Sequence, residues 1–253
     1  MEIDLNCDMG ESFGIYRIGN DEEMMKYVNS ISVGCGFHAG DPHVMRETVS
    51  LARKYGVAVG AHPGYPDLMG FGRRKMEITP EEAKDYILYQ VGALKAFCEA
   101  AGLELQHVKP HGEFYQMLWK NDTLAQGVLE AVRSIRPEPI FLALYNTIPY
   151  EMAQSMGIRV AGELYADLDY YPDGTTFIKK VHGKIDTQAT VEKVVKMVLD
   201  GKVTASDGKE IEVKGRSICF HGDNPQSPQV AKAVREALEK KGVRIVPLGS
   251  QSY

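Results

Sequence analysis

The sequence of 253 residues has little of what marks secreted, membrane-spanning or nucleic-acid-binding proteins. Its four cysteines form no CxxC pair, so we expect free thiols in a reducing compartment. No apolar run approaches the roughly 18 residues that a membrane span needs. Basic residues number 29 against 34 acidic ones, and the net charge of −5 argues against partners such as nucleic acids or anionic membranes.

The beginning of the chain also lacks the signature of an export signal. Its first ten residues, MEIDLNCDMG, are acidic where a secretory signal is basic and then apolar. We therefore expect a cytoplasmic protein. A hydrophobic content of 44% is enough to bury a large core, which excludes a disordered chain.

Short apolar runs alternate with longer helical patterns along the whole sequence. Most runs are apolar on both faces, as parallel strands covered by helices should be. The expected strands are Ile3–Asp8, Ile31–Phe37, Val57–His62, Gln106–Lys109, Pro139–Leu144, Ile158–Glu163, Ser217–His221 and Val243–Leu248. Without a linker or a composition shift, the alternation predicts one α/β domain over residues 1–253, an irregular, seven-stranded parallel β/α barrel. A small exposed hairpin is expected at Lys202–Lys214.

Polar and ionisable residues gather where the expected strands end. In a parallel barrel these ends meet at one mouth, where active sites of this architecture are built. Such groups are costly in a core unless they are used. The residues at the strand ends are Asn6, Asp8, His38, His62, Lys109, His111, Glu163, His221 and Asp223.

Carboxylate, imidazole and ammonium groups in one pocket suit general acid–base chemistry. We expect Asp8 or Glu163 to activate water and Lys109 to neutralise developing negative charge. The remaining expected roles are proton transfer or oxyanion stabilisation by His62, His111 and His221, and substrate binding by Asn6, His38, Asp223, Arg73 and Arg74. The two arginines follow the third strand and could clamp a carboxylate or phosphate.

The same cluster offers ligands for a divalent metal, with Asp8, His38 and His62 as the leading candidates. No HExxH-type spacing selects this interpretation, so metal-assisted and metal-free chemistry both stay open. The segment Gly34-Cys35-Gly36-Phe37-His38-Ala39 matches a dinucleotide fingerprint. A dinucleotide site also needs an acidic residue at the end of the next strand, and none is present there. We therefore interpret the glycines as small residues that allow close approach of the backbone.

Seven blocks in order, LNCDMGESFG, VGCGFHAGDP, VGAHPGYPD, FGRR, VKPHGEFY, GELYADLDY and ICFHGDNPQ, resemble the LamB/YcsF family. The resemblance covers nearly the full chain. It implies a barrel related to glycoside hydrolases and sugar deacetylases. It also implies opening of the 5-oxoproline lactam to L-glutamate, with ATP as the co-substrate together with Mg²⁺. The implied partners are two further 5-oxoprolinase subunits, B and C.

Two other functions remain open at this point. One is a metal-dependent, deacetylase-like hydrolase that works without ATP, and the other is a protein that binds 5-oxoproline without catalysing a step. We place the enzyme subunit first, because a passive binder does not need ionisable groups at six strand ends.

Overall fold

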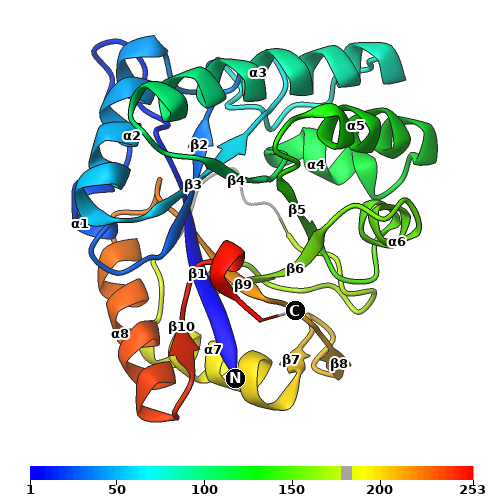
Figure 1. Ribbon diagram of the computed structural model, residues 1–253. Helices are drawn as coiled ribbons and strands as arrows, with labels where there is room; N and C mark the ends of the chain where they lie inside the picture. Colours follow the sequence, from blue (N-terminus) through cyan, green and yellow to red (C-terminus); the bar gives the residue numbers. More distant parts are fainter. Residues whose placement is uncertain (178–183, 253) are drawn as a thin grey trace.

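The computed structural model describes residues 1–177 and 184–252 (Figure 1). Within these residues, seven parallel strands form a barrel in the order β1-β2-β3-β4-β5-β6-β9, and β9 pairs back onto β1 to close it. The barrel strands are β1 (Glu2–Met9), β2 (Ser30–Gly34), β3 (Ala58–His62), β4 (Leu105–Val108), β5 (Ile140–Leu144), β6 (Val160–Tyr165) and β9 (Ser217–His221). The predicted seven-stranded barrel is confirmed.

Helices surround the barrel and cover the outer face of its strands (Figure 1). They are α1 (Asp21–Met24), α2 (Pro42–Tyr55), α3 (Pro80–Ala100), α4 (Gly112–Leu118), α5 (Asp122–Ser134), α6 (Ile148–Ser155), α7 (Thr187–Asp200) and α8 (Ser227–Lys240), with a short 3₁₀ turn at Leu248–Ser250. Thr79 begins α3 with a capping box to Glu82, and Asp41 caps α2 through the amides of its first turn. The apolar core lies between these helices and the strands.

The last expected strand, Val243–Leu248, is mostly wrong. Only β10 (Arg244–Ile245) is a strand, and it pairs with the first residues of β1 rather than forming a barrel stave. Pro247 ends it, because proline offers no amide for a further ladder bond. The expected hairpin is confirmed as β7 (Lys202–Thr204) paired antiparallel with β8 (Glu210–Glu212).

Alternate residues of β1 point into the barrel, and these residues are Asp4, Asn6 and Asp8. The inside of the barrel is therefore polar along this strand. At one end the Asp4 carboxylate accepts a hydrogen bond from the Ser217 hydroxyl. Further along, the Asn6 amide donates to Ser217 and to the Glu163 carboxylate. Asp8 stands at the other end, where the carboxyl ends of the strands open. These hydrogen-bonded side chains fill the barrel below Asp8.

The glycine-rich segment after β2 allows close backbone approach, as expected. A Cβ on Gly34 would lie 3.0 Å from the carbonyl oxygen of Gly10, in the loop that follows β1. These two loops therefore lie side by side at the mouth of the barrel. Among the helices of the described residues, none is both long and apolar enough to cross a membrane.

Candidate active site

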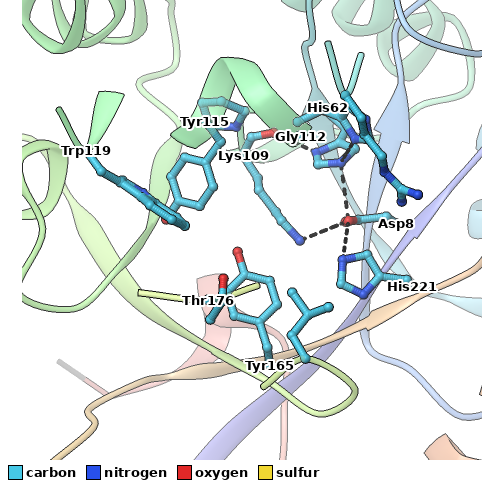
Figure 2. Close-up of a pocket in the computed structure, with 13 residues that line it drawn as sticks. Asp8, His62, Lys109, Gly112, Tyr115, Trp119, Tyr165, Thr176 and His221 are labelled. Carbon is cyan, nitrogen blue, oxygen red and sulfur yellow. Dashed lines mark hydrogen bonds and ion pairs between the residues drawn. The ribbon is translucent and has the colours of Figure 1, made fainter. Parts of the chain in front are cut away.

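A pocket opens at the carboxyl ends of the barrel strands (Figure 2). Its cavity of about 30 Å³ has room for about two water molecules. The residues that line it are Asp8, His62, Arg73, Lys109, Pro110, His111, Gly112, Tyr115, Trp119, Tyr165, Leu168, Thr176 and His221. Residues from both halves of the sequence thus meet around one small space, as the strand-end pattern predicts.

Asp8 is the centre of this pocket, and three cationic or imidazole groups converge on its carboxylate (Figure 2). Its Oδ1 accepts a hydrogen bond from Lys109 Nζ at 2.8 Å, and Oδ2 lies 3.2 Å from His62 Nε2 and 3.8 Å from His221 Nε2. Burial alone would raise the pKa of Asp8, but His62 and Lys109 override it and hold the pKa well below its ordinary value. Asp8 is therefore an ionised carboxylate.

Lys109 follows β4 and is buried with its ammonium group among acceptors. Its Nζ lies 3.0 Å from Glu163 Oε1 and 2.9 Å from Cys219 Sγ, in addition to its bond to Asp8. Burial would lower the pKa of Lys109, yet Asp8 and the other neighbours keep it well above its ordinary value. The pocket therefore contains a fixed positive charge next to a fixed negative one.

His221 ends β9 and is oriented by Asp167, a residue that the sequence analysis missed. His221 Nδ1 lies 2.8 Å from Asp167 Oδ1, so Nδ1 carries a hydrogen and Nε2 is directed to Asp8. Burial would lower the pKa of His221, but Asp167 outweighs it and raises the pKa above its usual value. The ring is thus suited to donate a proton.

Three buried imidazoles, of His38, His62 and His111, stand together with the Glu11 carboxylate beside Asp8. The rings of His38 and His111 are stacked, with centroids 3.6 Å apart, and His38 Nε2 lies 3.2 Å from Glu11 Oε1. One nitrogen or oxygen from each residue lies within 4.8 Å of the others, a spacing that a metal ion could bridge. Sequence reasoning named the histidines but missed Glu11, which follows β1 in a loop without periodic signal.

Glu163 and Asn6 lie deeper than the pocket and do not line it. The Glu163 side chain is fully buried, and its carboxylate contacts Lys109 and the Asn6 amide. Glu163 therefore holds Lys109 in place, and of the two carboxylates expected to activate water only Asp8 reaches the cavity.

The expected clamp of two arginines is not formed. Arg73 lines the pocket and donates to Asp223 at 3.1 Å. Arg74 is paired instead with Asp67 of its own loop, and 62% of its side chain is exposed. Substrate contact through Arg73 and Asp223 thus stays a prediction, whereas Arg74 stands outside the lining of the pocket.

Three aromatic residues of the lining were not expected from the sequence. Tyr165 extends β6 by two residues beyond Glu163 and so shares its face, a signal that strand parity could have supplied. Tyr115 and Trp119 are four residues apart at α4, and their rings meet edge to face at 5.1 Å. Figure 2 shows Tyr115 and Trp119 on the side of the pocket away from Asp8.

The fold and the site together define a (β/α) barrel protein with an acid–base pocket at the carboxyl ends of its strands. The chain belongs to the LamB/YcsF family, whose model matches residues 3–252. It is 53% identical over 251 residues to a Thermococcus onnurineus protein named as the A subunit of 5-oxoprolinase, with 98% of each chain covered. It is 51% identical to a Pyrococcus horikoshii protein of the same name, again over 98% of both chains.

Solved structures show the same fold. The crystal structure of a lactam utilization protein from Thermus thermophilus matches with a TM-score of 0.90 and 42% identity, covering 97% of this chain and 99% of that one. A putative cellobiose-phosphate cleavage protein from Enterococcus faecalis has the same fold, with a TM-score of 0.55 at 15% identity and coverage of 100% and 99%.

Proposed function

We propose that this chain is the A subunit of a 5-oxoprolinase and opens the lactam of 5-oxoproline to give L-glutamate. The observation that carries the proposal is the ionised Asp8 carboxylate, held against Lys109 and His221 in the pocket at the carboxyl ends of the strands. The names and high identity of the relatives supply the substrate.

An unactivated lactam resists hydrolysis because its amide resonance must be broken. Transfer of a phosphoryl group from ATP to the lactam oxygen makes the carbonyl carbon electrophilic. Addition of water to that carbon and cleavage of its bond to nitrogen then leave an amine and an acyl phosphate. A second water releases phosphate and gives the carboxylate of glutamate.

The charge of each pocket residue determines the role that we propose for it in this reaction. Asp8 orients the attacking water and accepts its proton, and the His221 imidazolium donates a proton to the departing nitrogen. Lys109 stabilises the developing oxyanion or phosphate. Arg73, which lines the pocket, is proposed to bind the carboxylate of the substrate.

We propose that the partner subunits B and C carry part of the ATP-driven activation, as the family resemblance implies. The sequence of this chain contains no GxxxxGK[ST] phosphate loop. ATP then acts as a co-substrate with Mg²⁺ in the complex.

The test is a 5-oxoproline-dependent glutamate assay of this chain alone and with subunits B and C, with and without ATP. We expect turnover only in the complete mixture with ATP, and loss of at least about a hundredfold in Asp8→Asn. Asp122→Asn, an exposed change at the start of α5, is the control and keeps full activity. Unchanged turnover in folded Asp8→Asn contradicts the assignment of Asp8.

Binding is measured separately from turnover through the single tryptophan of the chain, Trp119, which lines the pocket. A lactam that enters a cavity of about 30 Å³ must displace water and shift nearby side chains, so its binding changes the fluorescence of Trp119. Saturable binding of 5-oxoproline without turnover in any mixture would favour a binding protein over an enzyme.

A further inference from the structure

We propose that Glu11, His38, His62 and His111 bind one divalent transition-metal ion beside Asp8. The four side chains come from the loops and strand ends after β1, β2, β3 and β4, and all are buried. The ligand chemistry, three imidazoles and one carboxylate, is that of zinc and related ions rather than of Mg²⁺ or Ca²⁺.

The hydrogen positions on two of the rings carry the argument. His62 Nδ1 lies 2.7 Å from the carbonyl oxygen of Lys109, and His111 Nε2 lies 2.8 Å from the carbonyl oxygen of Phe71. A carbonyl oxygen only accepts, so both of these nitrogens carry hydrogen. The remaining nitrogens, His62 Nε2 and His111 Nδ1, lie 2.9 Å apart. In neutral rings two lone pairs meet there, and in a protonated His62 ring a single hydrogen faces both His111 Nδ1 and Asp8 Oδ2.

Two lone pairs at this separation repel each other, and the carboxylates of Asp8 and Glu11 lie beside them. Asp8 Oδ2 lies 3.2 Å from His62 Nε2, and Glu11 Oε1 lies 3.8 Å from His111 Nδ1. A cation placed among these atoms turns the repulsion into coordination. Backbone carbonyls that fix the tautomer of a ligating histidine are the usual outer support of a metal site.

The spacing of the ligand atoms suits such an ion. Ligands about 2.0–2.2 Å from a tetrahedral zinc stand roughly 3.3–3.6 Å apart. Here the adjacent atoms of Glu11, His38, His62 and His111 are separated by 2.9, 3.2 and 3.8 Å. Small side-chain adjustments therefore bring the four atoms to coordination distance.

The backbone around the cluster is built closely against the imidazoles. A Cβ on Gly72 would lie 2.7 Å from His38 Cβ and 2.8 Å from His111 Cδ2, and one on Gly64 would lie 2.6 Å from His38 Nδ1. Glycine at both positions lets the loop after β3 close over the rings, which holds their orientation.

A second group with suitable atoms, Asp8, Cys219 and His221, is a weaker candidate. The Lys109 ammonium already lies 2.8 Å from Asp8 and 2.9 Å from Cys219, so a divalent cation there would face a fixed positive charge. The Glu11 carboxylate instead pairs with imidazoles, those of His38 and His111. The ion therefore belongs with Glu11.

The use of this ion in catalysis rests on the proposed function. Asp8 Oδ2 lies 3.2 Å from His62 Nε2, so the ion would stand beside the carboxylate that accepts the proton of the attacking water. A transition-metal ion lowers the pKa of bound water to about 7. The bound ion would thus make the attacking water acidic enough to pass its proton to Asp8.

The test is metal binding by the chain without substrate. After treatment with chelator, the wild-type protein is titrated with Zn²⁺ by calorimetry, and with Co²⁺ by visible absorption. We expect one ion per chain and a Co²⁺ spectrum typical of four- or five-coordinate nitrogen and oxygen ligands. Glu11→Gln and His111→Asn should each weaken Zn²⁺ binding at least about tenfold.

His43→Ala is the matched control, since His43 is an exposed histidine on α2 that pairs with Glu47. It should keep the wild-type affinity. No binding of Zn²⁺ or Co²⁺ to the wild-type protein overturns the proposal, and so does equal affinity in folded Glu11→Gln. Because no 5-oxoproline is present, failure here leaves the proposed lactam chemistry standing, and failure of the glutamate assay leaves the metal site standing.

Discussion

Lys109→Met tests whether the Lys109 ammonium offsets the free-energy cost of burying the carboxylates of Asp8 and Glu163. Its Nζ lies 2.8 Å from Asp8 and 3.0 Å from Glu163, and each of these residues is at most 3% exposed. Removal of one partner of a buried ion pair costs about 3–5 kcal/mol, because the remaining charge is left without compensation. We expect the free energy of unfolding of Lys109→Met to fall by this amount.

The assay is equilibrium unfolding in urea, where a slope of about 3 kcal/mol per molar places the midpoint roughly 1 M or more below that of the wild type. The double variant Lys109→Met/Glu163→Gln removes one of the two carboxylates and should recover at least about 1 kcal/mol. It should stay inactive in the glutamate assay, because the cation of the pocket is still missing.

Lys232→Met, an exposed change on α8, is the control and should alter stability by no more than about 0.5 kcal/mol. The reasoning is refuted if Lys109→Met unfolds within about 1 kcal/mol of the wild type. It is also refuted if the double variant is no more stable than the single one.

Three further predictions concern other residues. Burial, with a contribution from Glu163, raises the pKa of Asp4 to about 7, so the folded state binds a proton that the unfolded state releases near the ordinary pKa of 3.8. This contribution to stability is lost as pH rises from about 4 to 7. In urea unfolding, Asp4→Asn should therefore be more stable than the wild type at pH 8, by up to ~4 kcal/mol. At pH 4 the two proteins should be about equally stable. Asp167→Asn should lower the pKa of His221 and move the alkaline limb of the kcat/KM profile to lower pH, and an unshifted limb would remove His221 as the acid. Gly72→Ala, at a φ of +64° and against two imidazoles, should destabilise the fold and weaken Zn²⁺ binding, whereas Gly208→Ala in the β7–β8 turn, also at positive φ but with open space around it, should leave Zn²⁺ affinity unchanged.

The barrel and the centre of the site follow from regularities that a sequence displays. Strand parity places Asn6 and Asp8 on one face of β1, and the parallel arrangement brings the ends of distant strands to one mouth, which predicts that Asp8, His62, Lys109 and His221 lie together. Their meeting around a single carboxylate bears out that geometry.

The other parts of the site depend on loop conformation and on how deep a strand residue lies in the barrel. Neither property leaves a periodic pattern in the sequence. Glu11 and Asp167 lie beyond the strands, where no alternation indicates which way a side chain points. Arg73 and Arg74 are adjacent and chemically alike, yet Asp67 captures one of them and Asp223 the other. Glu163 has the expected parity, but the register of β6 against β9 pairs it with Ser217 rather than with His221, which puts it below the pocket.

The pairing of β1 with β9 has a consequence for synthesis on the ribosome. β1 leaves the ribosome before the other barrel strands, but β9, the strand that closes the ring against it, follows all of them and ends at His221. Until then Asp4 lacks its partner Ser217, and Asp8 faces an open edge without His221. A nascent or truncated chain that stops before β9 therefore holds neither a closed ring nor a competent pocket, and its reactive groups stay apart until β9 has been made.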